Sequence, residues 1–244
     1  MGLLDRLGDR LEGKGKTILY GIGGLALSAV LVFVAVKWNN RKNDEAREAM
    51  GRAITVTTTP VSASGLSIPG NFTSDKERAQ RAVEEFEKVA AKYGEPYRSQ
   101  AKYFAASNRL SLDRPKAITE LTDLSKGSDK EVSSLAKFAL AQAKENSGSL
   151  DEAAALYADI ARSNDPTISA ESANLRLAKV YVKQGKTKEA TDLLFNLVDA
   201  SRKAKGPDQL PVPPSSAARE AATELQKLDP TRYAQLTPET PLLG

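Results

Sequence analysis

The sequence predicts an all-α protein, in which a single N-terminal transmembrane helix precedes an α-solenoid of about four helix pairs and a C-terminal capping helix. First, Asn174 to Asp199 carries apolar residues at helical spacing on both sides of a turn at Gly185, as in a helical hairpin. Second, the small residues that open each second helix recur at intervals of 35, 36 and 37 residues, at Ala82, Ala117, Ala153 and Ala190. Third, the 19 residues from Ile18 to Val36 carry no charge.

Residues 1–16 form a short amphipathic tail, which the topology inferred below places in the cytoplasm. Four leucines share one helical face, which favours a helix lying at the membrane surface; they are Leu3, Leu4, Leu7 and Leu11. The alternative is a polar tail without regular structure, since three glycines weaken any helix here.

Residues 17–38 are predicted to cross the lipid bilayer, because their uncharged core would span roughly 28 Å as a helix. A cleaved signal peptide has a shorter apolar region and a small-residue cleavage site, whereas this run ends in Val36, Lys37 and Trp38. Gly21, Gly24 and Ser28 lie near one face and could contact another membrane helix. The alternative is that they reflect only the frequent use of glycine in membrane helices. Basic residues flank the span on both sides, so charge does not set its orientation.

Residues 39–202 form the predicted solenoid. Its first helix covers Asp44 to Ile54, and an inserted loop rich in Thr, Ser, Pro and Gly follows at residues 55–74. Ser74 with Glu77 and Ser149 with Glu152 have the spacing of helix-capping boxes. Periodicity then predicts helices over Glu77–Tyr93, Tyr97–Leu110, Pro115–Ser125, Lys130–Glu145, Leu150–Arg162, Ala170–Gln184 and Lys188–Arg202.

Two further segments follow the solenoid. Residues 203–215 contain four prolines and one glycine, and therefore form a proline-rich loop or hinge. Residues 216–244 contain a helix over Ser216 to Leu228 that is suited to cover the open end of the solenoid, and then a tail.

The repeated positions resemble the tetratricopeptide repeat. One copy is formed by Asn174, Leu177, Ala178, Tyr181, Gly185, Ala190 and Leu194, and the copy before it by Leu140, Ala141, Gly148, Ala153, Tyr157 and Ile160. The copy that begins at Leu140 departs from the pattern at Lys144, which replaces a tyrosine. In the copy before it, which contains Ala117, Leu112 replaces the turn glycine. These positions build a scaffold, so they predict the fold more specifically than the function.

The resemblance implies that the first helix of each pair lines a protein-binding groove. Aligning the copies places nine residues in that groove: Lys102, Arg109, Leu135, Phe138, Gln142, Leu175, Lys179, Val182 and Lys183. Apolar side chains interleaved with cations would suit an extended or helical segment with acidic flanks. The alternative is that Leu135 and Leu175 pack between helices and that the lysines are ordinary surface residues.

Composition excludes several kinds of chemistry. The chain has no Cys and no His, so it lacks thiolate nucleophiles, zinc–thiolate sites and the commonest general base. Acidic residues are spread singly over polar helix faces, and we predict no catalytic residue, cofactor, metal or small-molecule substrate. The net charge of +4 comes from the N-terminal region, because residues 43–244 hold 28 basic and 28 acidic side chains. A nucleic-acid partner is therefore not expected.

The whole arrangement resembles the family of the ancillary subunit of the bacterial SecYEG translocon, over about Gly13 to Arg202. The features that carry the resemblance are the apolar span, Trp38 after it, the helix with Ala46, Ala49 and Ala53, the insertion and the helical array. It implies a single-pass protein of the bacterial inner membrane, with a cytoplasmic N-terminus and periplasmic repeats. Its implied partners are translocon subunits and periplasmic chaperones or emerging client proteins. The competing interpretation is a general envelope-assembly scaffold unrelated to secretion.

Overall fold

A computed structural model describes residues 41–62, 70–163, 165–207 and 209–238 of the chain. Within these ranges the secondary structure is helical, apart from two isolated β-bridges. The predicted all-helical class is therefore confirmed for the described residues. The chain divides into two compact units, Met1–Arg52 and Ala53–Gly244.

The predicted tail at 1–16 and transmembrane segment at 17–38, including Gly21, Gly24 and Ser28, lie outside the described residues. In the part of the chain that the structure does describe, no helix combines the length and the apolar character needed to cross a membrane.

The helix predicted at Asp44 to Ile54 is present but longer, because it occupies residues 41–58. The prediction ended it too early, at the start of a run of threonines. Two of these threonines bond back to the preceding turn, Thr57 to the carbonyl of Ile54 at 2.7 Å and Thr58 to that of Thr55 at 3.1 Å. Such bonds keep hydroxyl side chains compatible with a helix end. The insertion is correspondingly shorter than predicted.

The remaining helices lie within two residues of their predicted bounds where a prediction exists. The short last helix was not predicted. The helices are α3 (Asp75–Lys92), α4 (Tyr97–Arg109), α5 (Arg114–Leu124), α6 (Lys130–Asn146), α7 (Leu150–Arg162), α8 (Ala170–Lys183), α9 (Thr187–Lys203), α10 (Ser216–Leu228) and α11 (Pro230–Tyr233).

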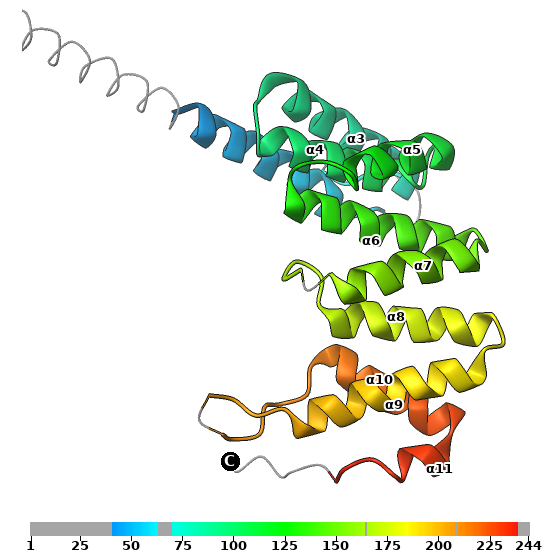
Figure 1. The fold of residues 1–244 in the computed structure, drawn as a ribbon. Coiled ribbons are helices and arrows are strands. Elements are labelled where there is room, and N and C mark those ends of the chain that lie inside the picture. The colour runs from blue at the N-terminus through cyan, green and yellow to red at the C-terminus, as the bar shows by residue number, and fades with distance from the viewer. Residues whose placement is uncertain (1–40, 63–69, 164, 208, 239–244) are drawn as a thin grey trace, which may run out of the picture. The chain divides into compact units, whose positions relative to one another are not determined.

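The helices of the second unit stack in chain order (Figure 1). Each of them packs on the next one along the chain, and helices two positions apart also meet where α4 contacts α6 and α8 contacts α10. Contacts that follow the chain order in this way are those of a helical solenoid.

The periodic alanines explain the spacing of the stack. Their side chains are completely buried at Ala82, Ala117, Ala153 and Ala190. A methyl group is the largest side chain that lets two helix backbones approach to roughly 8 Å, so each copy needs a small residue at this contact. Larger apolar side chains fill the space on either side, as where Phe86 of α3 stacks on Phe104 of α4 with ring centroids 5.1 Å apart.

Two glycines end the first helices of successive pairs in the same way. Gly148 and Gly185 have φ of +79° and +74°, a conformation that other residues rarely adopt. Each closes a Schellman motif, in which the next N–H reaches back five residues, from Ser149 to Lys144 and from Lys186 to Tyr181, at 2.9 Å in both cases. Gly148 and Gly185 therefore mark the same type of turn in two successive helix pairs.

The predicted capping boxes are only partly formed. Ser74 accepts a hydrogen bond from the Glu77 amide at 3.1 Å, as expected, but the Glu77 carboxylate binds the amide of Thr73 instead of that of Ser74. The second box is wrong: Ser149 makes no side-chain cap, and its amide, which Glu152 would have to bind, already donates to the Lys144 carbonyl. Glu152 instead pairs with Lys144 at 2.7 Å.

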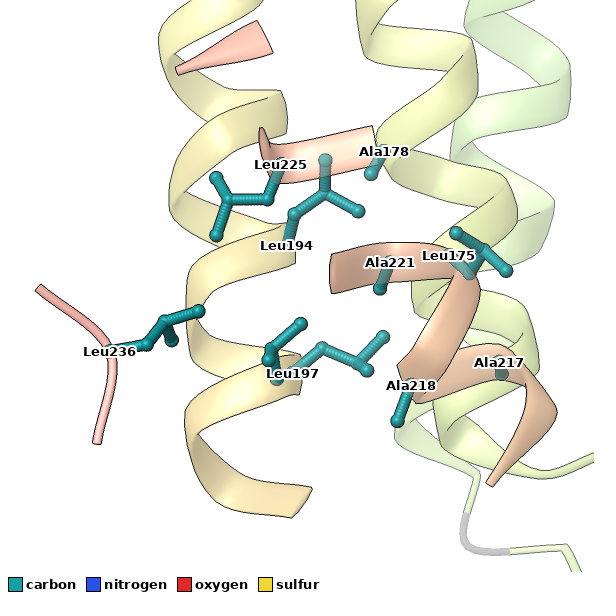
Figure 2. Close-up of a cluster of buried hydrophobic side chains, with 10 residues drawn as sticks. Leu175, Ala178, Leu194, Leu197, Ala217, Ala218, Ala221, Leu225 and Leu236 are labelled. Atoms are coloured by element: carbon teal, nitrogen blue, oxygen red, sulfur yellow. The ribbon is translucent and has the colours of Figure 1, made fainter. Parts of the chain in front are cut away.

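The C-terminal helices cover the last pair of the stack (Figure 2). Small residues of α10 face the leucines of α9, and Leu225 of α10 is completely buried. Leu236, after α11, also joins this cluster. The opposite side of α10 is polar, with Arg219 and Glu220 exposed or only partly covered. An apolar inner face and a polar outer face are what a solenoid needs at its end.

Candidate functional site

The nine residues predicted to line one groove are not gathered in one place. Lys102 and Arg109 line a pocket between α3, α4 and α5, Gln142 lines a second pocket, and Leu175 lies in the interior of the stack. The other five lie on α6 and α8, where they are half-buried or exposed.

Lys102 and Arg109 line the first pocket, which has a volume of about 460 Å³. Arg109 is buried, and its guanidinium binds the carboxylates of Glu87 on α3 and Glu120 on α5. Its charge is thus used inside the protein, and the prediction that it offers a cation to a partner is wrong. Lys102 remains exposed at the rim of this pocket.

Leu175 is buried in the cluster that α8, α9 and α10 share, so it cannot contact a partner. The alternative that it packs between helices is correct. Phe138 is half-buried and meets Tyr157 of α7 edge to face, with centroids 5.7 Å apart. Leu135 is also half-buried. Both of these side chains therefore offer only part of their surface.

The cations predicted on α8 are paired within the protein. Lys179 binds Glu220 of α10, and Lys183 lies 2.5 Å from Glu145 of α6. Val182 between them is 39% exposed, and it is one of the few large apolar side chains on the described surface. The lysines therefore contribute mainly to contacts between helices.

Of the predicted residues, Gln142 alone lines the second pocket, which has a volume of about 250 Å³. The other polar groups around it are Arg114 at the start of α5, Asn146 at the end of α6 and Arg176 on α8. Leu110, Ala139 and Ala143 supply its apolar surface. Two guanidinium groups and two amides thus surround a small apolar patch.

The charge around this pocket is positive. Glu145 also lines it, but its carboxylate is occupied by Lys183 and by the hydroxyl of Tyr157. Among the residues that the structure describes, none forms an ion pair with Arg114 or Arg176. Arg176 acts on Glu220 only at longer range, where it adds to the stronger effect of Lys179 in lowering the pKa of that carboxyl. The two arginines are therefore available to an anionic group from outside.

Local structure accounts for these positions. Arg114 follows the N-cap Asp113, whose carboxylate accepts the Lys116 amide at 3.1 Å and so fixes the first turn of α5. Asn146 is the last residue of α6, and the partial negative charge of a helix C-terminus favours cations nearby. These elements hold the two arginines near the end of α6.

The sequence reasoning missed Arg114 and Arg176, although a signal for Arg176 was present. On α8, Arg176, Lys179 and Lys183 recur at intervals of three and four residues, so they form one polar stripe beside the buried Leu175. Leu175, which the alignment placed in the groove, is buried. No comparable signal marks Arg114, because its position depends on how α5 meets α6.

The described residues contain no group of three or more acidic side chains placed to hold a metal ion. Comparison with family models, with curated proteins and with solved structures gave no significant match.

Proposed function

We propose that this chain is a protein–protein interaction module, anchored to the membrane by the apolar segment Ile18 to Val36, that binds an acidic segment of a partner protein. We further propose that it is a non-enzymatic accessory subunit of the Sec translocon, which it links to periplasmic chaperones or emerging clients. The first statement rests on the pocket between α6 and α8. The second rests on the resemblance of the anchor, insertion and repeats to the translocon subunit family.

The observation that carries the binding role is the pair Arg114 and Arg176, which line one pocket and form no ion pair with any residue that the structure describes. A guanidinium group can hold a carboxylate through two parallel hydrogen bonds, which fixes its orientation as well as its charge. Gln142 and Asn146 add amide groups beside them. An aspartate or glutamate side chain of a partner would fit these groups, while Leu110 and the alanines receive a neighbouring apolar side chain.

Each charge-assisted hydrogen bond of this kind contributes about 1.5–3 kcal/mol. Two arginines acting on one partner would therefore dominate recognition, although binding also costs the freedom of the bound segment. Long-range attraction between the positive pocket and an acidic segment would mainly raise the association rate.

A peptide titration tests the binding role. The full chain in lipid nanodiscs is titrated with a fluorescein-labelled peptide of alternating Leu and Asp, and with a matched peptide that carries Asn for Asp. We expect the acidic peptide to bind more tightly and Arg114→Gln with Arg176→Gln to weaken it by about tenfold or more. Arg162→Gln, which changes an exposed arginine on α7, is the control. Equal binding of both peptides, or an equal loss in the control, would contradict the proposal.

A second experiment separates the translocon role from a general envelope scaffold, which the same anchor and solenoid would also suit. The chain is purified from gently solubilised membranes under conditions that keep the translocon intact. The translocon proposal predicts that translocon subunits accompany it. If envelope proteins accompany it without them, the scaffold is the better explanation.

A further inference from the structure

The proline-rich segment between α9 and α10 displays an apolar edge that the pocket at α6 and α8 does not explain. Four large apolar residues are exposed in the described chain, and two of them, Leu210 at 57% and Val212 at 43%, lie in this segment. The sequence from Leu210 to Pro214 is Leu-Pro-Val-Pro-Pro. Three of its five residues are proline.

This composition fixes the backbone. A proline ring holds φ near −65°, and it restricts the residue before it to the extended and polyproline II region. Leu210, Val212 and Pro213 each precede a proline, so three of the five residues are restricted to extended or polyproline II backbone, and Pro211 forms an antiparallel bridge with Lys205. A segment that is already extended loses little conformational freedom when it is bound.

The segment is also tied to the protein at both ends. The Val212 amide donates to the Ala204 carbonyl at 3.1 Å, and the Gly206 amide donates to the Leu210 carbonyl at 2.9 Å. At its other end, Arg219 donates to the Pro214 carbonyl at 2.8 Å. Three hydrogen bonds therefore hold the segment, two of them to Ala204 and Gly206 at the start of the same loop and one to Arg219 of α10.

Exposure along the segment follows the three-residue period of polyproline II. Pro211 and Pro214 are half-buried, whereas Leu210 and Pro213 are exposed. The side of the segment with Pro211 and Pro214 faces the protein, and the side with Leu210, Val212 and Pro213 faces solvent. The exposed edge thus presents a leucine and a Val-Pro pair in a fixed arrangement.

The hydrogen-bonding groups narrow the kind of partner. Prolines have no N–H, and the N–H of Val212 is already bonded to Ala204, so the segment offers few donors for pairing with a β-strand. What it can present is apolar side chains and the carbonyl oxygens of Pro211, Val212 and Pro213, because those of Leu210 and Pro214 already accept hydrogen bonds within the protein. Grooves lined by Tyr and Trp recognise this combination, because the rings pack on proline while their hydroxyl and indole groups donate to carbonyls.

We propose that Leu210, Val212 and Pro213 form a docking edge for a partner protein whose groove is lined by aromatic residues and takes polyproline II segments. This edge lies in the segment between α9 and α10, and none of its residues lines the arginine pocket. A partner bound here and an acidic segment bound at Arg176 would use separate surfaces.

The test uses an SH3 domain and a WW domain as probes, because each carries an aromatic-lined groove of this kind. Each probe, labelled with ¹⁵N, is titrated with the full chain in lipid nanodiscs, and the indole N–H signal of its groove Trp is followed. We expect a saturable shift with at least one probe. Leu210→Ser with Pro213→Ala should weaken that binding by about tenfold or more.

Two controls make the result specific. Val182→Ser removes a valine of nearly the same exposure as Val212 from α8, and should leave probe binding unchanged. Arg114→Gln with Arg176→Gln should also leave it unchanged, so that failure of the pocket and failure of the edge are told apart. Circular dichroism establishes that every variant stays folded.

Three results would overturn the proposal. One is the absence of a saturable shift with either probe up to millimolar concentration. Another is a shift that persists in the Leu210→Ser, Pro213→Ala variant. The third is an equal loss of binding in Val182→Ser, which would place the contact elsewhere.

Discussion

The hydroxyl of Tyr157 on α7 donates a hydrogen bond to the carboxylate of Glu145 on α6, over 3.0 Å. Tyr157 is completely buried, and the Glu145 side chain is only 7% exposed. The same carboxylate receives Lys183 from α8 at 2.5 Å. Three consecutive helices therefore meet at one buried charge, beside the arginine pocket.

Tyr157→Phe is expected to lower the free energy of unfolding by about 1.5–3 kcal/mol, because the buried carboxylate loses a hydrogen-bond donor that water cannot easily replace. Urea denaturation measures the change. Tyr181→Phe is the control, since its hydroxyl makes no hydrogen bond within the described residues. A similar loss in both variants would show that the hydroxyl contact contributes little.

The buried phenol of Tyr157 should also make the stability of the fold depend on alkaline pH. Burial raises the pKa of its phenol above the ordinary value of 10, and the Glu145 charge raises it further. Because the folded-state pKa is the higher one, the stabilisation is fully present below about pH 10 and is lost as the pH rises above it. The free energy of unfolding of the parent should fall more steeply above pH 10 than that of Tyr157→Phe. Parallel slopes would contradict this.

The turn after α8 gives a backbone prediction. Gly185→Ala should destabilise the protein by about 1 kcal/mol, because alanine is strained at the φ of +74° that the Schellman turn requires. Gly94→Ala is a matched control: an added methyl group meets nothing within 4 Å there either, and Gly94 is not in the left-handed region. Thermal unfolding compares the two. An equal effect at both positions would exclude backbone strain as the cause.

The pKa of Glu220 on α10 depends on its contact with Lys179 of α8. The hydrogen bond from Lys179 lowers the pKa of Glu220 below its ordinary value, with smaller contributions from the charges of Lys179 and Arg176. Stability from this contact is present above the unfolded-state pKa and is lost as the pH falls through the folded one. Lys179→Gln should raise the Glu220 pKa toward its ordinary value. An NMR titration of the carboxyl carbons measures it, and an unchanged pKa would rule out the lysine as the main cause.

Local signals were sufficient to predict the helices. Alanines at intervals of 35 to 37 residues and glycines such as Gly185 mark contacts and turns that each helix pair makes within itself, so the sequence carries them directly. Leu112 shows the limit of this reasoning, because it takes the place of a turn glycine and α4 nevertheless ends at Arg109. There the amides of Leu112 and Asp113 both bond to the Arg109 carbonyl, at 2.9 and 2.8 Å, in a turn that needs no glycine.

The candidate site was harder to predict, because it depends on contacts between pairs. Repeat alignment identifies which helix a residue belongs to, but it does not show whether a charge such as that of Lys183 is paired by a neighbouring helix. Glu145 is 38 residues from Lys183, and no local pattern connects them. Arg114 and Arg176 likewise come from different helices, α5 and α8, and only the packing of these helices with α6 brings them to one pocket.

Arg109 supplies the last prediction, because it is a buried cation that the repeat pattern does not anticipate. Its guanidinium binds Glu87 of α3 and Glu120 of α5 at once, and so joins two helices through α4. A lysine has a single point of charge and cannot reproduce this two-sided contact. Arg109→Lys should therefore lower the free energy of unfolding by about 1–2 kcal/mol, a moderate value because both glutamates are partly exposed and water can replace part of the interaction. Urea denaturation compares it with Arg98→Lys, at an exposed position on α4. A double-mutant cycle with Glu87→Gln should give a coupling energy well above zero, whereas additive effects would show that the bridge does not stabilise the fold.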